Sequence, residues 1–155
     1  MKKIVLLAFV LVFLSMSTVG RFTIPVEASG TITINADGSI DPLDAPINTT
    51  DRVTYYLTAN ITDSIVVKRS NIIIDGNGYT VQGSGSGNGF YWNGINNVTI
   101  KNTNIKNFAY GVSIYSSNNS TVSGNTITDN TNCGVDLRGY NNITVSGNTI
   151  TNNTN

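Results

Sequence analysis

The sequence predicts an all-β fold in which the chain winds into a parallel β-helix, and three observations lead to this prediction. First, the segment NNSTVSGNTITDNTN at 118–132 returns almost unchanged as NNITVSGNTITNNTN at 141–155. A fixed period in the low twenties with Asn, Gly and Ser between short apolar stretches is typical of a solenoid. Second, each repeat holds three short strand-like stretches, for example 112–115, 121–123 and 126–128. Third, no window after the leader keeps a helical period, which disfavours a helical or leucine-rich solenoid.

Residues 1–28 are predicted to be a signal peptide that forms a helix ahead of the β-helix. Lys2 and Lys3 precede an unbroken apolar run at 4–14, and Val26-Glu27-Ala28 offers a small-residue cleavage site. The run is shorter than the roughly 20 residues that span a bilayer. We therefore expect export to the cell surface or medium. An uncleaved leader that anchors the chain in the membrane is the alternative.

Composition limits the classes of protein and partner. Only 12% of residues are charged and the formal net charge is zero, so nothing indicates a nucleic-acid surface. Cys133 is the single cysteine, which excludes an intrachain disulfide framework. We expect residues 29–61 to form an amino-terminal cap with entry strands, and residues 62–155 to form the regular turns.

Alternation within the strand-like stretches assigns side chains to the interior of the coil. The residues expected to point inward are Phe90, Trp92, Val98, Ile100, Ile105, Val112, Ile114, Val122, Ile127, Val135, Leu137, Val145 and Ile150. Asn125 and Asn148 lie in the bend SGNTI between the second and third stretches. We expect these two asparagines to adopt the left-handed backbone of that bend and to form a ladder of side-chain amides.

The repeats SGNTITDN and SGNTITNN, with Gly-hydrophobic-x-hydrophobic stretches between them, resemble those of NosD-like and carbohydrate-binding/sugar-hydrolase β-helix families. The upstream segments TITINADGSIDPLDAPI and YYLTANITDSIVVKRSNIIIDGNGYTVQG are similar to the opening of exported archaeal β-helix surface proteins. The resemblance covers roughly residues 30–155. The steps between aligned residues give about 22–23 residues per turn, and the resemblance implies that the coil is right-handed. The resemblance says little about activity because such repeats encode packing.

The sequence does not support a cofactor. The family name of NosD-like proteins implies copper delivery, but copper sites use imidazole, thiolate or thioether ligands. This chain has no histidine, both methionines lie in the leader, and Cys133 stands alone. The segment 75–78 could offer oxygens to calcium, yet it is shorter and has fewer carboxylates than a calcium loop, so we expect a turn.

The outer surface of the first stretch is the best binding candidate. Alignment of the repeats places Tyr91 and Asp136 in one column, and Tyr115 and Arg138 in the next. Aromatic rings beside hydrogen-bonding groups suit a polysaccharide or cell-surface glycan, although the same residues are ordinary on exposed strands. We find no paired carboxylates for catalysis and no metal site in this stretch.

Sequons for N-glycosylation recur along the chain. They fall at Asn48, Asn60, Asn97, Asn118, Asn119, Asn142 and Asn152. Asn97, Asn119 and Asn142 occupy the same corner of the aligned repeats, where glycans would form a row.

These observations predict an exported β-helix module that binds carbohydrate or has a structural role. One alternative is the amino-terminal part of a polysaccharide lyase or glycoside hydrolase, and another is an envelope or spacer protein. Asn155 aligns with Asn132 in the middle of a repeat. We therefore expect the coil to continue beyond this sequence, and an uncovered last turn to offer an edge for self-association.

Overall fold

The computed structural model describes residues 30–154, and every regular element in this part of the chain is a β-strand. The strands are β1 (Ile32–Ile34), β2 (Ile40–Asp41), β3 (Ile47–Asn48), β4 (Thr54–Leu57), β5 (Ile65–Val67), β6 (Ile72–Asp75), β7 (Thr80–Gln82), β8 (Asn88–Asn93), β9 (Val98–Lys101), β10 (Asn104–Lys106), β11 (Tyr110–Tyr115), β12 (Thr121–Ser123), β13 (Thr126–Thr128), β14 (Cys133–Arg138), β15 (Thr144–Ser146) and β16 (Thr149–Thr151). The predicted signal peptide lies outside the described residues. None of the described residues forms a helix that could cross a membrane.

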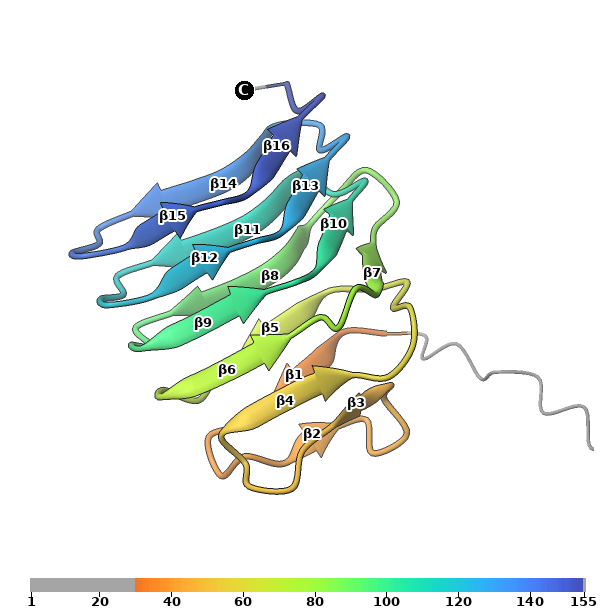
Figure 1. Ribbon diagram of the computed structural model, residues 1–155, viewed down its shortest axis with the longest axis vertical. Coiled ribbons are helices and arrows are strands. Elements are labelled where there is room, and N and C mark those ends of the chain that lie inside the picture. The colour runs from red at the N-terminus through yellow and green to blue at the C-terminus, as the bar shows by residue number, and fades with distance from the viewer. Residues whose placement is uncertain (1–29, 155) are drawn as a thin grey trace, which may run out of the picture.

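The strands form three sheets that run along the long axis of the molecule (Figure 1). Sheet A has the order β14-β11-β8-β5-β1-β2, sheet B the order β15-β12-β9-β6-β4-β3, and sheet C the order β16-β13-β10-β7. Four successive turns each contribute one strand to every sheet: turn 1 holds β5–β7, turn 2 β8–β10, turn 3 β11–β13 and turn 4 β14–β16. All pairs between turns are parallel, as a coiled single chain requires. The prediction of an all-β solenoid is confirmed.

The amino-terminal end of the stack differs from the rest. β2 pairs antiparallel with β1, and β3 pairs antiparallel with β4. β1 and β4 themselves already lie parallel to the strands of turn 1. The antiparallel strands therefore cover the ends of sheets A and B, while the parallel stacking begins within the segment that was expected to be the cap and its entry strands.

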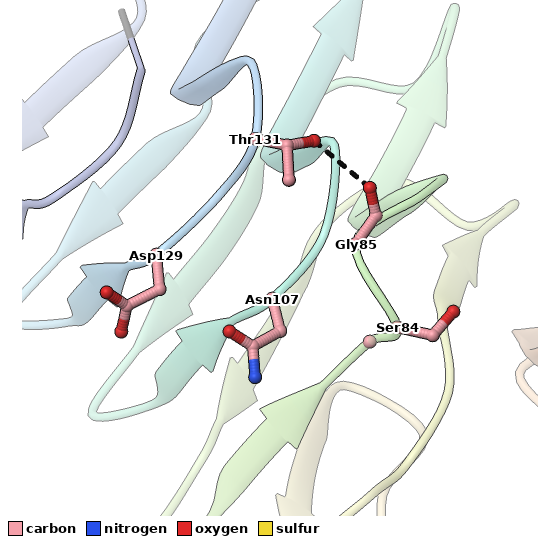
Figure 2. Close-up of a pocket in the computed structure, with 6 residues that line it drawn as sticks. Ser84, Gly85, Asn107, Asp129 and Thr131 are labelled. Atoms are coloured by element: carbon pink, nitrogen blue, oxygen red, sulfur yellow. Dashed lines mark hydrogen bonds between the residues drawn. The ribbon is translucent and has the colours of Figure 1, made fainter.

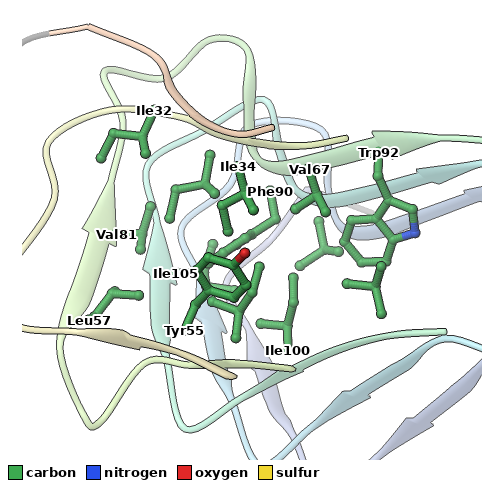
Figure 3. Close-up of a cluster of buried hydrophobic side chains, with 14 of the residues drawn as sticks. Ile32, Ile34, Tyr55, Leu57, Val67, Val81, Phe90, Trp92, Ile100 and Ile105 are labelled. Carbon is green, nitrogen blue, oxygen red and sulfur yellow. The ribbon is translucent and has the colours of Figure 1, made fainter. Parts of the chain in front are cut away.

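A narrow apolar core fills the coil because the same column of each sheet holds an apolar residue in successive turns (Figure 3). Tyr55, Phe90, Trp92 and Phe108 supply its bulkiest side chains, and isoleucine and valine supply most of the rest. Of the residues expected to point inward, those of turns 2 and 3 are fully buried, as predicted. The buried columns form one continuous core from the amino-terminal strands to turn 3.

The last described turn departs from that prediction. Val145 and Ile150 are in register with Val122 and Ile127, but they are 39% and 42% exposed. Val135 and Leu137 are only partly buried against the core. These side chains sit in the expected columns, yet the described part of the chain contains no further turn to cover them.

Candidate functional site

The outer face of sheet A brings the four predicted binding residues together. Strand pairing places Tyr91, Ser113 and Asp136 in one column and Asn93, Tyr115 and Arg138 in the next. Successive strands of a sheet lie about 4.8 Å apart, so side chains in neighbouring turns are within contact range. We call Tyr91, Ser113, Tyr115, Asp136 and Arg138 the tyrosine patch. The predicted alignment of the columns is confirmed, whereas a role in binding stays a prediction.

Direct contacts link the members of the patch. The hydroxyl of Tyr115 donates to Oδ2 of Asp136 at 2.8 Å, and Nε of Arg138 donates to Oδ1 of the same carboxylate at 3.2 Å. The guanidinium carbon of Arg138 lies 5.3 Å from the centre of the Tyr115 ring, within the range of a cation–π contact. The rings of Tyr91 and Tyr115 meet edge to face with their centres 5.7 Å apart. Hydrogen bonds and ring contacts therefore connect the members of the patch to one another without a ligand.

Ser113 lies in the middle of the patch, between Tyr91 and Asp136 in the column that alignment of the repeats predicts. Its column partners face outward, yet it is fully buried, which means that neighbouring side chains cover it. Its hydroxyl donates to Oδ1 of Asn88 at 2.7 Å. A small residue at this position gives the larger side chains of Tyr91 and Tyr115 space to lie over the sheet.

The electrostatics of the patch follow from the shared carboxylate. The hydrogen bond to Asp136 raises the pKa of Tyr115 above its ordinary value, and burial adds to this effect. The hydrogen bond and charge of the same carboxylate also raise the pKa of Arg138. Arg138 and Asp136 form an ion pair, with Nε 3.1 Å from Oδ2, so their charges offset one another. The surface offers aromatic faces and hydrogen-bonding groups without a net charge.

The two most regular turns differ mainly at this face. We call the segment 118–132 and its copy 141–155 the doubled phrase. It covers the strands of sheets B and C in turns 3 and 4, and its two copies differ only at Ser120/Ile143 and Asp129/Asn152. On sheet A, by contrast, the inward residues stay apolar while the remaining register pairs change completely. These pairs are Tyr110/Cys133, Ser113/Asp136 and Tyr115/Arg138. Packing of the core therefore does not determine which residues occupy the positions of the patch.

Comparison with known proteins now places this fold in a family. The family model described as right handed beta helix region matches residues 48–155. The chain belongs to the right-handed β-helix family. Comparisons with curated proteins and with solved structures return no match. The NosD-like subtype and the likeness to archaeal surface proteins therefore stay predictions.

The carboxylates of this β-helix protein are spread over its outer surface. Asp75 lies at the end of β6 on sheet B, Asp129 follows β13 at a corner, and Asp136 lies on sheet A. A glycoside hydrolase needs two carboxylates about 5–10 Å apart across one bond. These three residues of the regular turns lie on different sides of the coil. Burial raises the pKa of the Cys133 thiol, which opposes formation of a reactive thiolate.

Two ladders of asparagine side chains hold the corners on either side of sheet C. In the first, Nδ2 of Asn125 donates to Oδ1 of Asn148 at 3.0 Å, and the backbone of Thr103 donates to Oδ1 of Asn125. The left-handed residues at this bend are Gly124 and Gly147, with φ of 64° and 62°. The expectation that the asparagines adopt this conformation is therefore wrong, because the glycine before each one makes the bend and leaves the amide free to point inward.

The second ladder was missed from the sequence. Nδ2 of Asn130 donates to Oδ1 of Asn153 at 2.7 Å, and the backbone of Phe108 donates to Oδ1 of Asn130. Asn130 is 1% exposed, so these bonds satisfy polar groups within the core. The signal was present, since Asn130 and Asn153 occupy equivalent places in the doubled phrase.

The sequon corner forms a third, exposed row of amides. Asn97, Asn119 and Asn142 adopt left-handed backbones with φ of 57°, 56° and 54°. Nδ2 of Asn97 donates to Oδ1 of Asn71, and Nδ2 of Asn142 donates to Oδ1 of Asn119. The amide nitrogens of Asn97 and Asn142, to which a glycan would be attached, are therefore engaged in the row, and glycosylation at these sequons stays a prediction.

Proposed function

We propose that this protein is an exported, surface-displayed β-helix module that binds carbohydrate through the tyrosine patch. The observation that carries the proposal is the contrast within the repeats. The residues inside the coil and on sheets B and C recur from turn to turn. The outer positions of sheet A differ between turns, and they hold two tyrosines in contact and an ion pair. Ligand sites combine apolar and aromatic side chains with a few placed polar groups, and the tyrosine patch has this composition.

The ion pair points to neutral sugars. Because Asp136 and Arg138 offset each other, the patch has no excess charge to attract an acidic or basic polymer. Asp136 retains acceptor capacity beyond the bonds from Tyr115 and Arg138, since a carboxylate has about four acceptor positions. Sugar hydroxyls can use these positions while a pyranose ring stacks on the exposed part of a tyrosine.

Export and the finer family assignment belong to the same proposal. The basic start, the apolar run and the small-residue site of residues 1–28 support export. The description of the matching family supports a right-handed winding of the coil. The repeats that resemble NosD-like and surface proteins support display at the cell surface.

A structural spacer is the second candidate, and one observation favours it. Tyr115, Asp136 and Arg138 satisfy one another, as residues on an inert strand surface also do. A spacer would use the stack as a rod and would need no ligand.

A glycan array probed with the wild-type chain, Tyr115→Ala and Arg138→Ala tests the proposal. We expect the wild type to bind at least one neutral polysaccharide, and each variant to lose about 10-fold or more in affinity, as the removal of one good contact implies. Thr121→Ala, on the outer face of sheet B, is the control and should bind like the wild type. Absence of binding to every glycan would reject the proposal and leave the spacer.

A further inference from the structure

A loop between turns 1 and 2 builds a wall at the corner beyond sheet C. Residues 84–87 leave the coil after β7, and the backbone N–H of Gly85 donates to the carbonyl of Asn107 at 2.6 Å. The hydroxyl of Thr131 donates to the carbonyl of Gly85 at 3.0 Å (Figure 2). Thr131 belongs to the turn after that of Asn107, so the loop is fixed against two successive turns.

The wall borders an open hollow of about 340 Å³ lined by Gly83, Ser84, Gly85, Asn107, Asp129 and Thr131. We call it the loop hollow. Small-molecule sites span roughly 300–1,000 Å³, so the loop hollow lies at the lower end of that range and exceeds what a bare ion fills. Its size fits one or two sugar units.

Ser84, Asn107 and Asp129 line the hollow, and their side chains form no hydrogen bond to another described residue. Ser84 and Asp129 are exposed and Asn107 is half-buried, so these polar groups are open to solvent or to a ligand. Asn107 and Asp129 follow paired strands and share a left-handed backbone with φ of 58°, so they occupy equivalent corners one turn apart. Elsewhere in this molecule, asparagines stacked in this way bond to each other, as Asn119 and Asn142 do. Here no hydrogen bond joins the amide to the carboxylate, and the two side chains lie next to each other among the residues that line the hollow (Figure 2).

The repeat itself draws attention to the same corner. Within the doubled phrase only two positions differ, and one of them is Asp129, which becomes Asn152 one turn later. Asn152 keeps the left-handed backbone with φ of 55°. The carboxylate is therefore not required by the fold at this corner, and it appears where the loop forms a wall.

We propose that the loop hollow is a second binding site, which takes a neutral saccharide unit independently of the tyrosine patch. The Asp129 carboxylate can accept bonds from two adjacent hydroxyls, and the Asn107 amide can both donate to and accept from a third. The set matches a polyol, which presents donors and acceptors on neighbouring carbons.

The donor set favours a saccharide over a cation. Calcium takes about 6–8 oxygen ligands with several carboxylates in most sites, and the hollow supplies one carboxylate. No cluster of three or more His, Cys, Asp or Glu side chains suitable for a metal occurs between residues 30 and 154. Calcium binding is nevertheless an outcome that the experiment must separate.

The test is an NMR titration of the isotopically labelled 155-residue chain. The probes are glucose, mannose, galactose and N-acetylglucosamine, their disaccharides, and calcium chloride alone. We expect at least one saccharide to shift the side-chain amide resonances of Asn107 to saturation. Asp129→Asn should weaken that binding by about 10-fold or more, because a hydrogen bond to a charged group is lost.

Asn152 shows that the fold accepts asparagine at this corner, so Asp129→Asn is expected to fold. Asp44→Asn removes an exposed carboxylate near the other end of the stack and should leave the titration unchanged. The inference is overturned if no saccharide shifts Asn107, if Asp129→Asn binds as tightly as the wild type, or if only calcium saturates the shift. Saccharide shifts confined to Tyr91 and Tyr115 would also overturn it while leaving the proposed function intact. Saccharide shifts confined to Asn107 would support the inference and count against binding at the tyrosine patch.

Discussion

The outer face of sheet A and those of sheets B and C differ within the same two turns. On sheets B and C the outward residues of turns 3 and 4 are all hydroxyl-bearing: Thr121, Ser123, Thr126, Thr128, Thr144, Ser146, Thr149 and Thr151. On sheet A the corresponding surface holds tyrosines, a buried serine and an ion pair. The interior is apolar behind all three sheets.

This difference separates the part of the repeat that builds the stack from the part that is free to vary. Threonine is common on exposed strands, where it favours the strand conformation and needs no specific ligand. Inward positions cannot vary freely, as Gly111 shows: a Cβ there would lie 2.6 Å from the carbonyl oxygen of Gly134. We infer that recognition depends on the few outer positions where the repeats diverge, and that the rest of the coil is scaffold.

The largest expected effect is on the scaffold. Trp92→Ala should lower the free energy of unfolding by about 3–5 kcal/mol, because it removes the bulkiest fully buried side chain. Leu137→Ala, in the same column but partly exposed in turn 4, should cost less than about 2 kcal/mol. Trp92→Phe should cost less than Trp92→Ala, since it keeps a ring and removes an indole N–H without a partner in the described structure. Urea unfolding followed by circular dichroism measures all three, and equal costs at Trp92 and Leu137 would contradict the account.

The next effect concerns the asparagine ladder. Asn125→Ala should destabilise the fold by about 2–3 kcal/mol, because the backbone of Thr103 and the carbonyl of Ile100 lose their partner inside the core. Asn148→Ala should cost less, since its side chain is only half-buried and water can replace the lost bonds. Thermal or urea unfolding compares the pair. A change below about 0.5 kcal/mol for Asn125→Ala would show that the ladder is not a source of stability.

Making sheet A resemble the other sheets tests recognition directly. The double variant Asp136→Thr with Arg138→Thr should lose about 10-fold to 100-fold in affinity for the glycan identified on the array, because charge-assisted hydrogen bonds are removed. Its cooperative unfolding should persist, since both side chains lie outside the core. Calorimetric titration measures the affinity. Unchanged binding would show that recognition does not use this face.

A smaller effect on stability should depend on pH, and it concerns Asp75 at the end of β6 in turn 1. Burial alone would raise the pKa of Asp75, but hydrogen bonds from Asn77, Lys101 and Asn102 outweigh it and lower the pKa of this carboxyl below its ordinary value. A lowered folded pKa contributes stability above the unfolded value, and this contribution is lost as the pH falls through the folded pKa. Asp75→Asn should therefore destabilise by about 0.5–1 kcal/mol at neutral pH, with the difference from wild type vanishing in acid. Urea midpoints across the acid range measure it, and a difference that persists or grows in acid would contradict the assignment.

The smallest effects should come from the hydroxyl faces. Thr126→Val and Thr149→Val lie on the outer side of sheet C, and each should change stability by no more than about 0.5 kcal/mol. Neither should alter glycan binding. The same unfolding and array measurements apply, and lost binding in either variant would move the recognition surface to sheet C.

The sequence predicted most of the stack because the later turns repeat with little change. The columns containing Phe90, Val112 and Val135 could be read from residue spacing alone, and their register is as expected. The early turns are less regular, because the step from Ile72 to its partner Val98 is longer than the step from Val122 to Val145. Loops such as 84–87 absorb the extra residues, and their path is set by hydrogen bonds that a repeat pattern does not encode.

The candidate sites show the same limit. Repeat alignment placed Tyr115 beside Asp136 in neighbouring turns, but it could not give the hydroxyl–carboxylate bond, which depends on side-chain rotamers. The loop hollow was not predicted either, because Thr131 and Gly85 lie two turns apart in the sequence and only the fold brings them into contact. Residue types indicated where chemistry is available, and the structure was needed to show which groups meet.

A crystal structure of the chain with the best-binding array glycan tests the central claim most directly. The account predicts a sugar ring stacked on Tyr91 or Tyr115, with hydroxyls bonded to Asp136, and no sugar on the threonine faces of sheets B and C. A glycan bound along Thr126 and Thr149, with the tyrosine patch unoccupied, would contradict it.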